Sequence, residues 1–100
     1  MHRKTFFIYG IFRMRIWARQ FKETHMLCDE LIEDYSNDTR THKVFAAVAE
    51  VCRRMDLPQP AWLESNKKEF KRSAVTRFTQ DSFIEEIPFD YLEFRIIEED

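Results

Sequence analysis

Residues 12–19 read FRMRIWAR, in which apolar and basic side chains alternate and only Trp17 departs from the pattern. A period of two is typical of a strand that buries one face, because successive side chains of a strand point to opposite sides. The side that we expect to face the core consists of Phe12, Met14, Ile16 and Ala18. The opposite side consists of Arg13, Arg15, Trp17 and Arg19.

The other end of the chain has the same period with the opposite charge. Residues 91–97 read YLEFRII, so Leu92, Phe94 and Ile96 share one side of a second predicted strand. The first 22 residues carry six bases and no acid, whereas the last 22 carry eight acids and one base. The basic side chains of the first strand could form an open surface for phosphates and bases. We favour their pairing with Glu93 or Glu33 on neighbouring strands, where each opposite-charge pair adds roughly 0.2 to 1 kcal/mol.

Residues 39–55 are the clearest helix in the sequence, introduced by the turn cluster at residues 36–38 and ended by Pro58 and Pro60. Its apolar face is predicted to consist of Val44, Phe45, Val48, Val51, Cys52 and Met55. The opposite face would then present Arg40, Lys43, Ala47, Glu50 and Arg54.

The remaining segments are shorter. Residues 26–35 fit both a helix and a strand, and we favour a strand that forms a hairpin with the first one. Three short elements are predicted further on: a strand at 61–63, a helix at 67–72 capped by Ser65 and Asn66, and a strand at 75–78. The fold class is therefore α+β, with a small mixed or antiparallel sheet packed on one principal helix at about 39–55. We expect one domain at 14–100, with 1–13 as an N-terminal extension.

Five segments resemble a family of small bacterial proteins that has no established function: residues 39–45, 62–66, 76–85, 89–93 and 96–100. The resemblance begins at about Met14 and is looser before Asp38. It implies strands at 15–21 and 26–34, and it assigns no site residue. It also raises Met14 as an alternative start, which peptides beginning before Met14 in the natural protein would exclude.

Several classes of function are excluded or disfavoured by composition. The single glycine, Gly10, cannot build a phosphate-binding loop, a dinucleotide-binding turn or a nucleophile elbow. Zinc sites usually show two close ligand pairs, and only the pair His25-x-x-Cys28 is present. His42 and Cys52 are possible further ligands, but they do not form a second close pair. We therefore predict no metal, no cofactor and buried free thiols at both cysteines. The N-terminal apolar run of only eight residues is followed by Arg13 and Arg15 and by no small-x-small cleavage site, which argues against a signal peptide. It is also far too short for a membrane span, so we favour a soluble cytoplasmic protein.

The basic stretch at residues 65–77 is the sharpest candidate site. It could bind an anion or single-stranded nucleic acid through Ser65, Asn66, Lys67, Lys68, Lys71, Arg72 and Arg77, with aromatic residues interleaved. The simpler interpretation is a solvated basic face that balances acids elsewhere, and a pI of about 5.9 disfavours general nucleic-acid binding.

Three functions are compared on this basis. The leading hypothesis is a non-catalytic accessory or regulatory module that binds protein, itself or another, through the N-terminal or C-terminal strand at a sheet edge. The alternative is the nucleic-acid or anion binder of residues 65–77. An enzyme comes third, because it would need a pocket that joins Asp81 to His42 or His25. No catalytic residue and no membrane partner are predicted.

Overall fold

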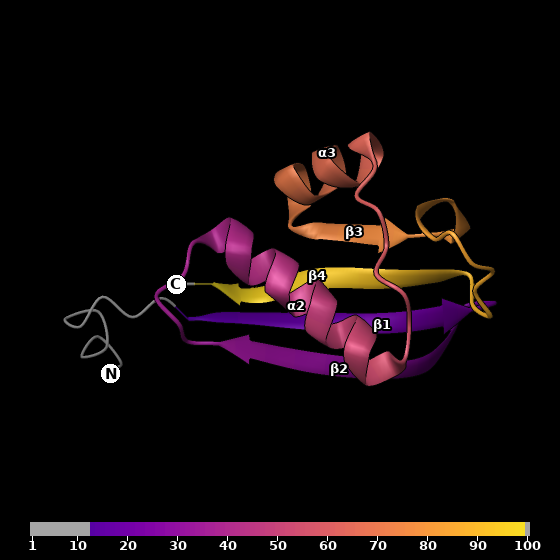
Figure 1. Ribbon diagram of the computed structural model, residues 1–100, viewed down its shortest axis with the longest axis horizontal. Helices are drawn as coiled ribbons and strands as arrows, with labels where there is room; N and C mark the ends of the chain where they lie inside the picture. Colours follow the sequence, from indigo (N-terminus) through magenta and orange to yellow (C-terminus); the bar gives the residue numbers. More distant parts are fainter. Residues whose placement is uncertain (1–12, 100) are drawn as a thin grey trace.

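The computed structural model describes residues 13–99 and has the predicted α+β architecture (Figure 1). In chain order its elements are β1 (Met14–Lys22), β2 (His25–Asp34), α2 (Arg40–Met55), α3 (Glu64–Ser73), β3 (Val75–Phe78), a short 3-10 helix (Gln80–Ser82) and β4 (Tyr91–Glu99). Residues 1–12 of the predicted extension, and Asp100, lie outside the described residues.

The four strands form one antiparallel sheet in the order β2-β1-β4-β3. β1 and β2 form the predicted hairpin through Glu23 and Thr24, whose φ angles of 51° and 69° suit the two-residue turn that matches strand twist. The prediction that the N-terminal or C-terminal strand lies at a sheet edge is wrong. β1 and β4 are the two central strands because they pair with each other, and β2 and β3 are the edges.

The opposite charges of the two chain ends meet across β1 and β4, as predicted. Arg15 lies 3.2 Å from Glu33 of β2 and 3.3 Å from Glu98 of β4. Arg19 forms an ion pair with Glu93. The basic face of β1 is therefore neutralised within the sheet.

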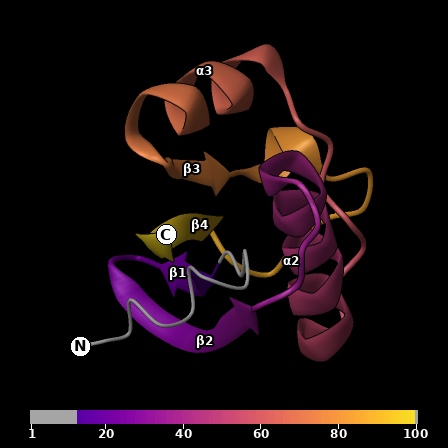
Figure 2. The same ribbon diagram turned by 90° about the vertical axis from the view of Figure 1, so that its left-hand side faces the viewer.

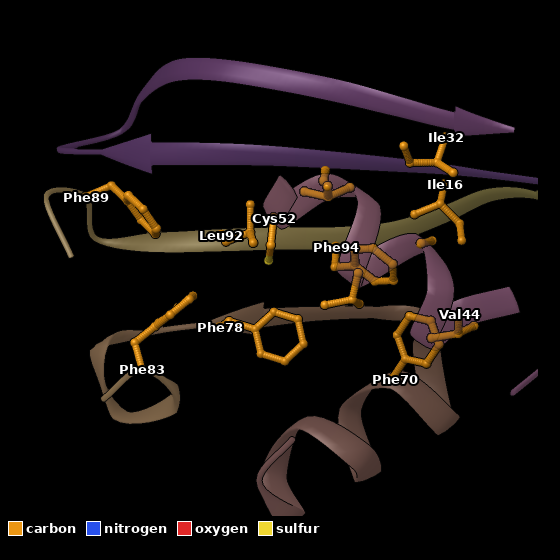
Figure 3. Close-up of a cluster of buried hydrophobic side chains, with 14 of the residues drawn as sticks. Ile16, Ile32, Val44, Cys52, Phe70, Phe78, Phe83, Phe89, Leu92 and Phe94 are labelled. Carbon is orange, nitrogen blue, oxygen red and sulfur yellow. The ribbon is translucent and has the colours of Figure 1, made fainter. Parts of the chain in front are cut away.

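One face of the sheet carries the core. Along β1 the buried side chains alternate with half-buried ones, and α2 covers the buried side while α3 lies over the β3 edge (Figure 2). Phenylalanines from α3, β3 and β4 fill the space between sheet and helices together with residues of the loop before β4 (Figure 3). The labelled core residues are Ile16, Ile32, Val44, Cys52, Phe70, Phe78, Phe83, Phe89, Leu92 and Phe94.

The principal helix begins and ends as expected but is rotated relative to the prediction. Thr39 is its N-cap and accepts a hydrogen bond of 3.2 Å from the His42 backbone N–H. Lys43 and Ala47 were predicted on the outer face and are buried, whereas Phe45 was predicted inside and is 51% exposed. Phe45 lies instead at the side of α2 that faces Trp62, with the two ring centres 6.0 Å apart.

Three further local predictions are wrong. The short helix begins at Glu64 with Leu63 as its N-cap, so Ser65 and Asn66 lie within its first turn and do not precede it. Residues 61–63 form no strand but an extended loop, held by a 2.8 Å hydrogen bond from the Ala61 N–H to the Ser82 carbonyl. Cys28 is exposed because the outer strand β2 is only lightly covered by α2, whereas Cys52 is buried as expected. Strand β3 lies where it was predicted.

Candidate functional site

A depression with a mainly apolar lining lies between α2 and α3, and we call it the α2–α3 groove. It has a volume of about 530 Å³, within the range of ligand pockets. Its lining consists of Arg40, Thr41, Val44, Phe45, Trp62, Lys67, Phe70 and Lys71.

The floor of the groove is aromatic and is organised by Trp62. The indole meets the rings of Phe45, Phe70 and Phe78 edge-on, at centroid distances of 6.0, 5.5 and 5.0 Å. Edge-to-face packing of this kind holds rings in fixed positions. Since Phe78 and Phe70 are buried in the core and Phe45 is half exposed, the floor is a rigid extension of the core to the surface.

The rim of the groove carries three cations from two helices. Lys67 and Lys71 are one helical turn apart on α3, and Arg40 comes from the first turn of α2. Lys67 makes only a loose contact of 3.6 Å with Glu64 in the same helix. Arg40 is bound to Glu99 at 2.6 Å, and its guanidinium lies 5.7 Å from the Phe70 ring centre. The groove therefore combines an apolar floor with a positively charged rim.

The structure divides the basic stretch predicted at residues 65–77 among several surfaces. Lys67 and Lys71 line the α2–α3 groove, and Lys68 is exposed on α3 outside it. A second, smaller pocket contains Ser65, Asn66 and Arg77, together with the acids Glu69 and Asp81. A third contains Arg72 and Arg77 beside Glu69, Glu93 and Arg95. The seven residues thus form no single basic patch, because Glu69 and Glu93 interrupt it.

Asn66 is placed as a structural residue. Its side chain is buried, donates to Thr76 Oγ1 at 2.8 Å and to the Arg77 carbonyl at 3.0 Å, and accepts from the Leu63 N–H at 3.0 Å. These bonds tie the first turn of α3 to β3. The amide is therefore already satisfied and is not aimed at an external anion.

Replacing Asn66 with alanine is expected to lower the free energy of unfolding by about 2 kcal/mol, because the buried Thr76 hydroxyl and the Arg77 carbonyl lose a donor. Urea denaturation would measure the change. The neighbouring exposed Ser65→Ala variant is the control and should stay within about 0.5 kcal/mol of the wild type. Equal stability of the two variants would contradict the structural role of Asn66.

The same contacts close the β3 edge of the sheet. Glu69 accepts from the Arg77 N–H at 3.2 Å, while Asn66 donates to the Arg77 carbonyl. A partner strand adding to β3 would need these backbone groups, so side chains of α3 block that route. Protein binding through this edge is therefore disfavoured.

The residues considered for catalysis and metal binding do not come together. Asp81 lines a pocket whose described lining contains no histidine. His42 is bonded to Asp38 at 2.8 Å, and this hydrogen bond lowers the pKa of the Asp38 carboxyl. Burial raises the pKa of the Cys52 thiol to about 11, which makes it a poor nucleophile. Within residues 13–99 no three His, Cys, Asp or Glu side chains are grouped to hold a metal ion.

Sequence reasoning located Lys67 and Lys71 but missed Arg40, Thr41, Val44 and Phe45. The exposed position of Phe45 has no signal in the sequence, because its spacing fits the apolar face of the helix. Comparison with models of protein families, with curated proteins and with solved structures gave no match for the chain. Among the described residues, no helix has the length and apolar character needed to cross a membrane.

Proposed function

We propose that this protein is a non-catalytic binding module that takes an acidic protein segment with an apolar anchor into the α2–α3 groove. The observation that supports the proposal is the combination of an aromatic floor, made of the half-exposed Phe45 and the partly buried Trp62, with three cations around it. An apolar anchor would be desolvated on the floor, and flanking carboxylates would meet the rim. The groove replaces the sheet edge as the predicted route of protein binding.

Single-stranded nucleic acid is the alternative occupant, and the groove suits it less well. Bases bind such proteins mainly by stacking on free ring faces. Trp62 is held among three other rings in edge-to-face contacts, so the groove presents a packed aromatic floor and only the half-exposed Phe45 stands clear of it.

The experiment is a titration followed by tryptophan fluorescence. The chain has two tryptophans, so Trp17→Phe leaves Trp62 in the floor as the reporter. The probes are a synthetic peptide with leucine and phenylalanine anchors between aspartates, the same peptide with serine anchors, and a single-stranded oligonucleotide. We expect only the first peptide to shift the Trp62 emission in a saturable way.

Charge variants of α3 then locate the site. The double variant Lys67→Glu with Lys71→Glu should weaken binding of the anchored acidic peptide about tenfold, since two rim contacts of up to roughly 1 kcal/mol each are reversed. Lys68→Glu with Arg72→Glu makes the same change in net charge on the same helix outside the groove, and should change the affinity little.

Three results would contradict the proposal. The first is equal weakening by both double variants, which would indicate only long-range attraction. The second is undiminished binding of the serine-anchored peptide, which would remove the role of the aromatic floor. The third is oligonucleotide binding that weakens steeply with salt while the peptides fail to bind, and this would favour the alternative occupant.

A further inference from the structure

Among the described residues, no helix lies over the face of the sheet opposite α2 (Figure 2). We call it the open face. Its side chains lie in rows that run across the strands, because paired residues in an antiparallel sheet share one face. From the strand registers, the first row is Asp29, Arg19, Glu93 and Arg77, and the second is Leu31, Trp17, Arg95 and Val75. A third row is Met26, Phe21 and Tyr91.

Several side chains of the open face are in contact with one another. The Arg19 guanidinium sits over Trp17 at 4.1 Å and binds Glu93, and the Trp17 Nε1–H donates to Asp29 at 2.8 Å. Arg77 lies over the Tyr91 ring at 4.8 Å. The Glu93 side chain is only 4% exposed, and it lies in a pocket that α3 residues border at the β3 end of the face. The face is thus ordered and partly desolvated before any partner arrives.

Charge alternates along the first row in the order of the strands: negative on β2, positive on β1, negative on β4 and positive on β3. If a second copy of this row is laid over the first in the opposite strand order, each acid faces a base. We propose that the open face binds a second copy of this chain, through a two-fold axis that runs along the strands between β1 and β4.

Rotation about this axis places β2 of one copy opposite β3 of the other, and β1 opposite β4. Each row then lies opposite the same row of the second copy. Asp29 then faces Arg77 of the second copy, and Arg19 faces its Glu93. In the next row Trp17 faces Arg95 of the second copy, a cation–π arrangement, and Leu31 faces its Val75. In the third row Phe21 faces Tyr91 of the second copy. In all three rows, side chains of opposite charge or of matching aromatic or apolar character therefore face each other.

A competing two-fold axis across the strands would place Asp29 near acids of the other β2, because β2 would lie over β2. Pairing of two β2 edges side by side would likewise bring Asp29, Glu30, Glu33 and Asp34 of both copies together. Like charges opposite each other destabilise such pairings. The axis along the strands is the arrangement that charge complementarity selects.

The size of the face is sufficient for a modest dimer. Three strands of nine or ten residues and one of four cover about 500 Å² per copy, given roughly 3.3 Å per residue and 4.8 Å between strands. About 1,000 Å² in total is at the lower end of specific interfaces, so we expect a weak and reversible association. Since α2 lies on the other side of the sheet, the α2–α3 groove stays accessible in this dimer.

The test is sedimentation of the full chain over a range of concentrations, with a pair of complementary variants. The wild type should dimerise reversibly. Asp29→Arg and Arg77→Glu should each weaken self-association about tenfold or more, because each places like charges opposite each other twice per dimer. An equimolar mixture of the two variants should associate again, since the arginine introduced at position 29 of one variant then meets the glutamate introduced at position 77 of the other. Glu85→Arg and Lys68→Glu repeat the same charge changes on exposed residues outside the three rows and should leave dimerisation unchanged.

Circular dichroism would establish that each variant is folded, and Leu31→Glu on the exposed part of β2 provides an independent disruption of the second row. A wild type that stays monomeric to millimolar concentration overturns the proposal. So does a mixture of the two variants that fails to associate although both are folded. Loss of peptide binding in the groove variants has no bearing on this result, because the groove and the open face are on different surfaces.

Discussion

Replacing Phe94 with alanine is expected to lower the free energy of unfolding by about 4 kcal/mol. Phe94 is fully buried on the central strand β4, with its ring centre 6.0 Å from that of Phe70 and 6.5 Å from that of Phe78. It therefore joins β4, α3 and β3 in one cluster, as Figure 3 shows. Alanine would leave a cavity that the rigid aromatic neighbours cannot fill. Chemical denaturation followed by circular dichroism measures the loss.

Ile84 provides the matched control for a large apolar residue. Its side chain is fully exposed, so Ile84→Ala should change the free energy of unfolding by less than about 0.5 kcal/mol. Phe94→Leu should fall between the two because it removes less volume. A loss below about 1 kcal/mol for Phe94→Ala would show that the cluster repacks freely, contrary to the expectation for a close-packed core.

Glu93→Gln is expected to lower the free energy of unfolding by about 3 kcal/mol at neutral pH. The Glu93 carboxylate is buried on the open face, binds Arg19, and has Arg95 at 3.5 Å and Arg77 at 3.9 Å. A neutral amide would leave the partly buried Arg19 without its counter-charge. Glu64→Gln is the control, since that side chain is 78% exposed and its loose contact with Lys67 contributes little.

The destabilisation by Glu93→Gln should disappear in acid. Burial alone raises the pKa of Glu93, but the hydrogen bond from Arg19 and the charges of Arg19 and Arg95 outweigh it and hold the pKa below its usual value. A lowered pKa means that the carboxylate stabilises the fold fully above its ordinary pKa and loses this effect as the pH falls through the folded value. The curves of stability against pH for wild type and variant should therefore converge below about pH 4. A difference that stays constant with pH would contradict the ion pair.

The strands were predictable because their signal is local. A period of two in residues 12–19 and 91–97, with bases in the first stretch and an excess of acids in the last 22 residues, indicated two half-buried strands that neutralise each other. The ion pairs of Arg15 with Glu33 and Glu98, and of Arg19 with Glu93, confirm this prediction. These strands are central because β1 also pairs with β2 and β4 also pairs with β3, although the sequence reasoning had placed one of them at an edge.

The helix faces and the candidate site were less predictable because they depend on distant neighbours. Phe45 has the spacing of a core residue, and only the position of Trp62 beside α2 shows that it is needed in the groove. Within the basic stretch, Lys67 and Lys71 line the same groove as Arg40. Asn66, in contrast, uses its side-chain amide for hydrogen bonds to β3. Residue type was visible in the sequence, but the surface to which each residue belongs was not.

By itself the sequence determined the α+β class, the two complementary strands and the principal helix, because periodicity and charge act over neighbouring residues. The tertiary structure alone decided the strand order, the rotation of α2, the groove between the helices and the alternating charge row of the open face. Each of these joins residues that are far apart in the chain. Their contact energies depend on how elements pack, and no local pattern records that.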